Sequence, residues 1–215
     1  MFRSSMVVLA LCLCASSLPA SLVPDFSSRV IISVRDQKLM LVRNGVEFAT
    51  YPVSTSKYGL GDRWGSLATP LGFFQVAEKI GDHAPVGAVF HNRRWTGEVL
   101  SPNAPDRDPV LTRIIWLRGL EAENAHAFRR CIYIHGTTEE KTIGRPASYG
   151  CIRMKSNDVA ALYSQLPLGE LVQIIQDRLP VASKVAAPSA PVSNALAPDP
   201  KRVSAGRPSA FRPRA

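Results

Sequence analysis

Cysteine is scarce in this sequence, with four residues among 215. Cys12 and Cys14 lie in an N-terminal apolar stretch, so a mature chain without that stretch keeps only Cys131 and Cys151. Two cysteines form one disulfide at most, which excludes a fold held together by several disulfides. Neither N-terminal cysteine follows a small residue, as a lipidated cysteine would require, so we expect removal of this segment without lipidation.

The sequence also lacks an apolar run long enough to span a bilayer comfortably. Its N-terminus has a basic residue, then an apolar stretch at about residues 6–18, then small residues. This order is typical of a secretory signal peptide, which we place at residues 1–20, and cleavage after Ser17 or after Ala20 fits equally well. We therefore expect an exported protein of the periplasm or cell envelope. The alternatives are an N-terminal core strand or a retained membrane anchor.

The body of the chain lacks the positive charge that the total suggests. The formal net charge is +9, but residues 180–215 carry six of the cations and one anion, a net of +5. Arg3 contributes one more positive charge, which leaves +3 for the body. A basic nucleic-acid face is weakly supported, so we expect no nucleic-acid partner.

Large apolar residues are almost absent from residues 179–215, where Pro, Ala, Ser and Arg dominate. Such a segment buries too little surface to offset the entropy of ordering, which predicts a disordered tail. A solvated end is the simpler interpretation, and electrostatic contact with an anionic envelope surface is the alternative. The remaining residues 28–178 have the length of one catalytic domain, expected to be a monomer.

Short runs with β character recur along this domain. Residues 29–35 and 38–43 precede Asn44-Gly45, which tolerates positive φ and predicts a hairpin with residues 46–53. Further runs of this kind cover residues 73–76, 113–117, 131–134 and 170–175. Ser156 fits the N-cap of the one convincing helix. The pattern predicts a mainly β, sandwich-like fold with one or two short helices.

Periodicity is missing from residues 81–112, which contain prolines and glycines throughout. A loop of this length inside a compact domain indicates a lid, a binding element or a small irregular subdomain. The three tryptophans are expected to be packing residues. Trp95 lies in this insertion beside Arg93 and Arg94, so it is also a candidate to cap a cleft.

His135 and Cys151 are the candidate base and nucleophile. A cysteine attacks as thiolate, and a free thiol with a pKa of about 8.5 is mostly protonated at neutral pH. It therefore needs a neighbouring base or cation, which a histidine at the end of a strand can supply. The spacing alone is weak evidence, because a lone buried cysteine is often an inert small hydrophobe.

Cys131 offers a competing interpretation, since an oxidising compartment favours a Cys131–Cys151 disulfide. If residues 131–135 form a strand, Cys131 and His135 lie on one face roughly 13 Å apart. A Cys151 that contacts His135 is then too far from Cys131 for the Cα separation of about 4.4–6.8 Å in a disulfide. We therefore favour the hypothesis of a free thiol.

Glycines adjoin both candidate residues. Gly136 allows a sharp backbone turn after His135, and Gly150 allows a substrate carbonyl to approach the main chain beside Cys151. The backbone N–H groups around Gly150 and Cys151 are then candidate donors to an oxyanion.

Four segments together resemble the YkuD-type L,D-transpeptidases. Residues 134–137 read IHGT and residues 148–154 read SYGCIRM, the two halves of that family's signature. Upstream, TPLGFF at residues 69–74 and YPVSTSKYG at residues 51–59 are similar to further elements of the family. The resemblance extends from about Val30 to Ile175.

The resemblance implies a specific chemistry. Cys151 would attack the L-centre carbonyl of a diamino acid in a peptidoglycan tetrapeptide stem, releasing D-alanine and leaving a thioester. His135 would take the thiol proton and later activate an amine or water. Arg153 would hold a substrate carboxylate or brace the loop, and Ser148 would bind substrate or fix the loop. The family role is a transferase in cell wall biogenesis and cell shape, without a cofactor or a metal.

Tyr149 departs from the family pattern, since many members have a histidine there. We expect that histidine to be dispensable, because His135 remains. The sequence identifies no Asp or Glu to orient His135, so a backbone carbonyl can serve. A zinc site of His126, His135 and Cys151 is a further alternative, although His83, His91 and His126 lack metal-ligand spacing among themselves.

Several functions remain open from the sequence. Cross-linking of stems, attachment of an envelope protein and hydrolysis by an L,D-carboxypeptidase share the thioester and differ in the acceptor. A non-catalytic peptidoglycan-binding module would keep the fold without the chemistry. A cysteine peptidase or zinc amidase of another family is the remaining alternative.

Overall fold

The computed structural model describes residues 28–181. The predicted signal peptide at residues 1–20 and residues 182–215 of the predicted tail lie outside the described residues, so both stay predictions. Leu179 still contacts the body of the domain, where its backbone N–H donates to Asp36 Oδ2 at 2.8 Å. Within residues 28–181, no helix is both long and apolar enough to cross a membrane.

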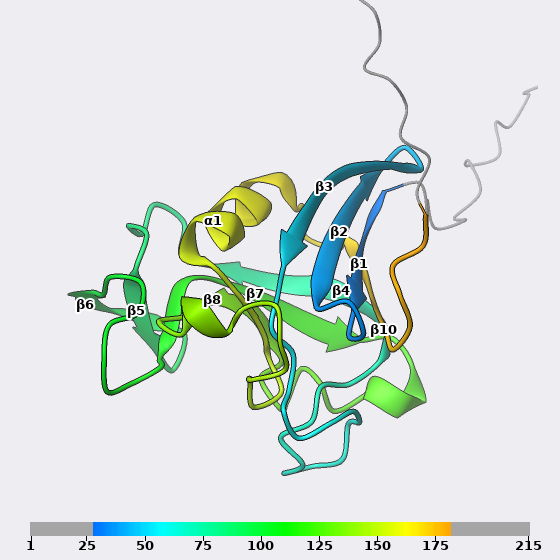
Figure 1. Ribbon diagram of the computed structural model, residues 1–215, viewed down its shortest axis with the longest axis horizontal. Coiled ribbons are helices and arrows are strands. Elements are labelled where there is room, and N and C mark those ends of the chain that lie inside the picture. Colours follow the sequence, from blue (N-terminus) through cyan, green and yellow to red (C-terminus); the bar gives the residue numbers. More distant parts are fainter. Residues whose placement is uncertain (1–27, 182–215) are drawn as a thin grey trace, which may run out of the picture. The chain divides into compact units, whose positions relative to one another are not determined.

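Strands dominate the described chain (Figure 1). They are β1 (Arg29–Ser33), β2 (Lys38–Arg43), β3 (Val46–Pro52), β4 (Gly72–Ile80), β5 (Ala88–His91), β6 (Arg94–Val99), β7 (Val110–Gly119), β8 (Tyr133–Gly136), β9 (Ile152–Met154) and β10 (Leu171–Ile175). The helices are α1 (Ser156–Gln165) and the 3-10 helices η1 (Ala122–Asn124) and η2 (Glu140–Thr142). The predicted mainly β class is confirmed.

The chain begins as an antiparallel meander of β1, β2 and β3, drawn in blue in Figure 1. Asn44 and Gly45 form the turn between β2 and β3, with φ of 52° and 75°. Asparagine and glycine adopt this left-handed backbone at low cost, so the predicted hairpin forms where the sequence places it.

β10 joins this meander to the rest of the sheet. It pairs in parallel with β1 on one side and antiparallel with β4 on the other. The resulting order is β3-β2-β1-β10-β4-β7-β5-β6, and β8 pairs with β7 and β9 off this path. One continuous sheet therefore folds over on itself and supplies both layers of the sandwich (Figure 1).

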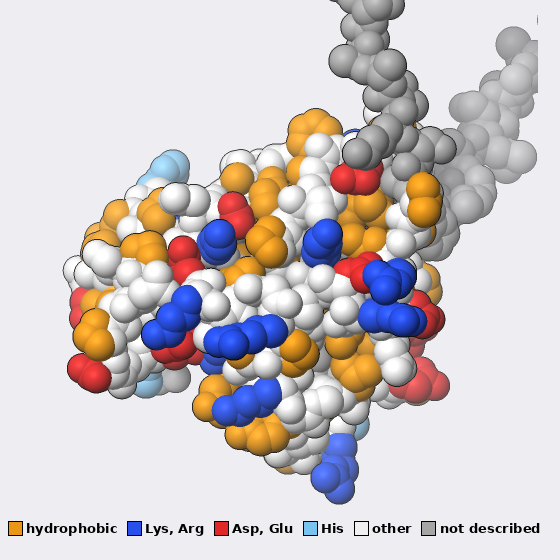
Figure 2. Space-filling model, viewed as in Figure 1, with side chains coloured by type: hydrophobic (Ala, Val, Ile, Leu, Met, Phe, Trp, Pro, Cys, Tyr) orange, Lys and Arg blue, Asp and Glu red, His pale blue; other side chains and the backbone are white. Residues whose placement is uncertain are grey.

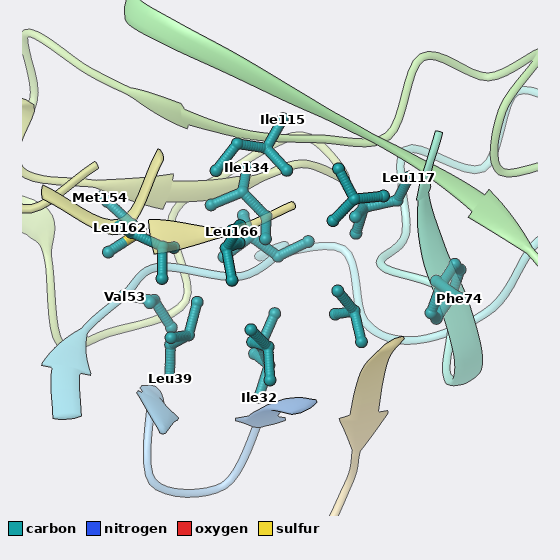
Figure 3. Packing of buried hydrophobic residues seen from close by; sticks show 14 of the residues in the cluster. Ile32, Leu39, Val53, Phe74, Ile115, Leu117, Ile134, Met154, Leu162 and Leu166 are labelled. Atoms are coloured by element: carbon teal, nitrogen blue, oxygen red, sulfur yellow. The ribbon is translucent and has the colours of Figure 1, made fainter. Parts of the chain in front are cut away.

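The main core lies between the two layers (Figure 3). Ile32 and Leu39 come from the meander, Ile115 and Ile134 come from β7 and β8, and all four side chains are fully buried. Leu162 of α1 packs into the same cluster. Each such side chain stabilises the fold by about 1.5–3 kcal/mol relative to exposure. The core thereby fixes β8, the strand that carries His135.

The segment at residues 81–112 is not one long loop, which corrects the prediction of an irregular insertion. It contains the hairpin of β5 and β6, and β5 pairs with β7. Asn92 and Arg93 close the hairpin with φ of 48° and 64°. Arginine is uncommon in left-handed backbone, so no turn signal marks this hairpin in the sequence. Residues 81–87 and 100–109 lie outside the strands, and the second of these stretches carries Asp108.

α1 begins one residue earlier than predicted, because Lys155 takes the N-cap position and Ser156 is the first helical residue. The backbone N–H of Ser156 donates to Glu140 Oε1 at 2.8 Å. A carboxylate from η2 therefore satisfies the helix start in place of the predicted serine hydroxyl.

Charges of both signs share the surface. On the face drawn in Figure 2, lysine and arginine side chains lie among aspartates, glutamates and apolar side chains, without a continuous basic area on that face.

Candidate active site

Two parallel strands hold the predicted base beside the predicted nucleophile. β8 and β9 pair with Ile134 opposite Ile152 and with His135 opposite Arg153. Successive side chains of a strand point to opposite faces, so the two isoleucines enter the core and His135 and Arg153 share the other face. Cys151 directly precedes β9, and its thiol lies against the backbone of Tyr133, two residues before His135 in β8.

The Cys151 thiol lies against the turn that leads into β8. The Tyr133 backbone N–H donates to its Sγ at 3.4 Å, and the thiol donates to the Cys131 carbonyl at 3.2 Å. Cys131 and Cys151 are both free, in agreement with the free-thiol hypothesis. The prediction that Cys131 lies far from Cys151 is wrong, however. Cys131 has a φ of 58° and precedes β8, so its carbonyl contacts the thiol instead of lying far along a strand.

His135 is almost fully buried, with 5% of its surface exposed. Its Nδ1 lies 2.6 Å from the Gly136 carbonyl oxygen. A carbonyl only accepts, so Nδ1 carries the proton and Nε2 keeps a free lone pair. Burial lowers the pKa of His135 to about 4, against the opposing effect of the Gly136 hydrogen bond. The imidazole is therefore neutral at pH 7, and a backbone carbonyl orients it.

Burial also raises the pKa of the Cys151 thiol to about 11, although the Tyr133 N–H and the charge of Arg153 act in the opposite direction. The thiol is thus protonated at pH 7. Within the described residues no hydrogen bond joins it to His135, contrary to the expected contact. Strand spacing and rise put their Cα atoms roughly 8 Å apart. The resting pair is a neutral thiol beside a neutral imidazole.

Ser148 closes the turn before the nucleophile. Its hydroxyl donates to the Cys151 carbonyl at 2.6 Å and accepts from the Gly150 N–H at 3.3 Å. Gly150 has a φ of 121°, which favours glycine, and its carbonyl accepts from the Thr69 hydroxyl at 3.0 Å. These bonds fix the loop. The oxyanion role predicted for the Gly150 N–H would require its bond to Ser148 to break.

Arg153 is buried beside the site and holds neighbouring segments in place. Its guanidinium forms an ion pair with Asp108 and donates to the Ala147 carbonyl at 3.3 Å. Asp108 also accepts a hydrogen bond from the Thr137 hydroxyl, two residues after His135. Asp108 thus connects the segment after Cys151 with the segment after His135. Sequence reasoning missed it, because no motif marks an aspartate in the irregular residues 100–109.

Gly136 does not make the predicted sharp turn. It lies inside β8, where an added Cβ would come 2.9 Å from the Leu111 carbonyl oxygen and 3.0 Å from Ser156 Oγ. Glycine here allows β7 and α1 to pack closely against β8. Its buried position supports a packing role.

Cys151 lines a surface pocket of about 290 Å³. Its lining includes Trp64, Leu67, Arg130, Ile132, Tyr149 and Cys151. Trp64 is 65% exposed, so the expectation that it packs in the interior is wrong. Asp62 holds the loop of Trp64, because it pairs with Arg130 at 2.8 Å. Trp116 does pack, stacked on Phe128 with ring centroids 4.0 Å apart, while Trp95 is half exposed.

Tyr149 separates this pocket from a second cavity of about 620 Å³, since it lines both. Arg153 lines the second cavity together with Lys57 and Arg145. Lys57 and Arg145 were not singled out from the sequence, although both lie in or beside the segments that resemble the family. The signal available was their sequence proximity to those segments.

The zinc alternative finds no support in residues 28–181, where no three His, Cys, Asp or Glu side chains are grouped to hold a metal ion. His126 instead pairs with Asp62, with Nδ1 at 3.3 Å from Oδ2.

Comparison with known proteins agrees with these motifs. The family model of the L,D-transpeptidase catalytic domain, YkuD, matches residues 27–174. Putative L,D-transpeptidase YqjB of Bacillus subtilis is 28% identical over 148 residues, which cover 69% of this chain and 71% of that protein. Probable L,D-transpeptidase YcfS of Escherichia coli is 27% identical over 172 residues, covering 76% of this chain but about half, 49%, of that protein.

Among solved structures, L,D-transpeptidase 3 from Mycobacterium tuberculosis aligns with a TM-score of 0.46 and 17% identity, covering 70% of this chain and 60% of that one. The match of the family model extends over most of the described domain and includes all four motif segments. The chain therefore belongs to the YkuD family of L,D-transpeptidase catalytic domains.

Proposed function

We propose that this protein is a peptidoglycan L,D-transpeptidase in which Cys151 is the nucleophile and His135 the general base. The observation that carries the proposal is the pairing of β8 with β9, because Cys151 directly precedes β9 and its thiol lies against Tyr133, two residues before His135. Nδ1 of His135 donates to the Gly136 carbonyl, which leaves Nε2 without a proton. The surface pocket that Cys151 lines supports the proposal, since a peptide could approach Cys151 there. Family membership supports the stem peptide as the substrate.

Proton transfer accompanies attack in this mechanism, because thiol and imidazole are both neutral at rest. Rotation of the Cys151 side chain away from the Cys131 carbonyl turns the thiol toward Nε2. The sulfur then bonds to the carbonyl carbon of the diamino acid L-centre while Nε2 takes the thiol proton. The bond to the terminal D-alanine breaks, its nitrogen receives that proton, and a thioester remains.

The second half of the reaction returns the enzyme to its resting state. An amine of a second stem attacks the thioester carbonyl and gives a proton to Nε2 of His135. The carbon–sulfur bond breaks, and the departing thiolate takes the proton back. An amine on an envelope protein gives attachment by the same steps, and water gives the carboxypeptidase reaction.

Product masses from purified protein and disaccharide-tetrapeptides test this proposal. We expect a cross-linked dimer if an amine is the acceptor and a tripeptide if water is. Cys151→Ala should lose every product, and the matched variant Cys131→Ser should retain activity. Retained turnover in folded Cys151→Ala would overturn the assignment.

Labelling by a carbapenem separates the enzyme from a non-catalytic wall-binding module. The related mycobacterial structure holds a faropenem-derived adduct. For this chain, we expect a covalent mass increase on the peptide that contains Cys151, and none in Cys151→Ala. If Cys151 of the folded wild-type protein stays unlabelled, the result would favour the non-catalytic binding module.

We also propose that the protein is exported to the periplasm or cell envelope, because its proposed substrate lies there. The predicted signal peptide at residues 1–20 supports this location. Cell fractionation and N-terminal sequencing of the mature protein test it: a cytoplasmic protein that keeps Met1 would contradict export.

A further inference from the structure

Cys131 and Cys151 border two different cavities. Cys151 lines the surface pocket of about 290 Å³, and Cys131 lines a cavity of about 430 Å³. Both cysteines are free and partly exposed, and both pack against the cluster of buried side chains that includes Trp116 and Tyr133. Each cysteine therefore lies beside a space that a small solute can enter.

The backbone of Cys131 lies directly against the sulfur of Cys151. Cys151 Sγ is 3.2 Å from the Cys131 carbonyl oxygen. A carbonyl oxygen lies about 2.4 Å from the Cα of its own residue, so the Cys131 Cα lies within about 5.6 Å of that sulfur. A disulfide requires Cα atoms about 4.4–6.8 Å apart. Side-chain rotation and a small adjustment of the turn therefore bring the two sulfurs within bonding range.

The Cys131 sulfur contacts Arg93 in the described structure. Nη1 of Arg93 lies 3.9 Å from Cys131 Sγ and 3.4 Å from the Tyr133 hydroxyl oxygen. Arg93 belongs to the exposed turn between β5 and β6, so its side chain can leave this contact without disturbing the core. Rotation about χ1 of Cys131 then moves the sulfur to another staggered position. The free thiols and a bonded pair thus differ by a local change in one turn.

Cysteine is an unusual residue for the backbone at position 131. Its φ of 58° lies in the left-handed region, which glycine and asparagine adopt at lower cost. The turn is held by main-chain bonds, from the Cys131 N–H to the Phe128 carbonyl at 3.1 Å and from the Ile132 N–H to the Ala127 carbonyl at 3.0 Å. Backbone preference therefore does not account for a cysteine at this position, which leaves its thiol as the reason.

We propose that Cys131 is a redox partner of Cys151 and forms a reversible disulfide with it. The oxidant is a small-molecule disulfide. The Cys131 sulfur attacks one sulfur of the oxidant and releases its first thiol, and the Cys151 sulfur then attacks the Cys131 sulfur and releases the second. The two cysteines lose two electrons and two protons, which the two released thiols gain. The effect on activity rests on the proposed function, because a bonded Cys151 cannot attack a stem peptide.

Peptide mapping of the full chain after treatment with glutathione disulfide tests for the bond. Free thiols are blocked with N-ethylmaleimide before the chain is unfolded and digested with trypsin. Residues 131–141 and 142–153 form separate tryptic peptides, because Arg145 precedes a proline and is not cleaved. We expect mass spectrometry to find these two peptides joined through Cys131 and Cys151, and dithiothreitol to separate them.

Turnover of disaccharide-tetrapeptides measures the effect on the nucleophile. The oxidised wild-type chain should keep about a tenth or less of the activity of the reduced chain, and dithiothreitol should restore it. The matched variant Cys131→Ser should lose activity about tenfold more slowly, because only direct attack by the protonated Cys151 thiol remains. Cys131→Ala, which also lacks the thiol, should behave in the same way. Circular dichroism of each variant verifies its fold.

The mapping and the turnover assay fail separately, which distinguishes this inference from the proposed function. Separate glutathione adducts on the two cysteines, or two unmodified cysteines, would overturn the inference, and so would equal rates of inactivation in wild type and Cys131→Ser. An active reduced chain that yields no joined peptide would remove the inference alone. A joined peptide from a chain that forms no product when reduced would remove the transpeptidase proposal and leave the disulfide.

Discussion

The sulfur of Cys151 lies in an environment that disfavours its charged form. Burial raises the pKa of the Cys151 thiol to about 11, and burial lowers the pKa of the His135 imidazole to about 4. A preformed thiolate–imidazolium pair would require the reverse order of the two values. Activation therefore has to accompany the arrival of substrate.

The rate of alkylation of Cys151 by iodoacetamide should reflect this protonation state. Below a pKa of about 11, the thiolate fraction increases tenfold per pH unit, so the rate should do so from pH 7 to 10. Peptide mass spectrometry measures the modification at Cys151 alone. Glutathione under the same conditions is the control and should level off sooner. A plateau for Cys151 below pH 8 would show a thiolate at rest and refute the neutral pair.

His135 should make the stability of the fold depend on pH. Its folded pKa of about 4 lies below the ordinary 6.5, so between these values the unfolded chain binds more protons and stability falls as the pH is lowered. We expect a loss of about 2 kcal/mol from pH 7 to pH 5. Urea denaturation at both pH values measures it.

Two variants serve as the comparison for that measurement. His135→Gln should lose this part of the pH dependence, since glutamine does not titrate. His83→Gln, at an exposed position, should keep it. An identical pH dependence in wild type and His135→Gln would contradict the lowered pKa.

At the scale of elements, Asp108 joins three segments that are far apart in sequence. It binds Arg153 in β9 and Thr137 after β8, from the irregular residues before β7. Asp108→Ala leaves a buried guanidinium without its partner, so we expect it to lower the free energy of unfolding by about 3 kcal/mol. The reduced hold on β8 and β9 should also lower kcat for the stem peptide.

Glu98→Ala is the matched control, because it removes a carboxylate from the exposed Arg107 ion pair. Exposed pairs contribute little, so its unfolding free energy should change by less than about 1 kcal/mol. Chemical denaturation of both variants gives the comparison. Equal effects would mean that Asp108 has no special role in joining the segments.

The sequence predicted those elements whose signal is local. Asn44-Gly45 marks its own turn, and the β-branched runs of β1, β2 and β10 mark their own strands. Cys151 and His135 were found because each lies in a motif of contiguous residues. The hairpin of β5 and β6 was missed, since Arg93 takes a left-handed backbone that its residue type does not signal.

Features that depend on long-range contacts could not be predicted in this way. The helix start is satisfied by Glu140, which is distant in sequence from α1, and so Ser156 was assigned a role that it does not have. The position predicted for Cys131 was wrong, because β8 begins at Tyr133, two residues after the start of the apolar run at residues 131–134. Asp108, Lys57 and Arg145 reach the site only through tertiary structure.

At the scale of the whole molecule, one sheet carries both layers of the described domain. β10 connects the meander of β1, β2 and β3 with β4 and β7. The buried side chains of the meander lie opposite those of β7 and β8 in one core cluster (Figure 3). Neither half can bury its apolar face without the other. We therefore expect the described domain to unfold as one cooperative unit.

The substitution Ile32→Ala tests this cooperativity, because Ile32 is fully buried in β1. The substitution should lower the free energy of unfolding by about 2–5 kcal/mol. The three tryptophans, Trp64, Trp95 and Trp116, all lie outside the meander, so their fluorescence reports on the other half of the sheet. In a single unit, this variant shifts the urea midpoint of tryptophan fluorescence as far as that of far-UV circular dichroism. Phe48→Ala, at a position 63% exposed in β3, should move neither midpoint appreciably. A fluorescence midpoint that stays at the wild-type value while the dichroism midpoint falls would mean that the meander unfolds separately, and that β10 does not couple the two halves.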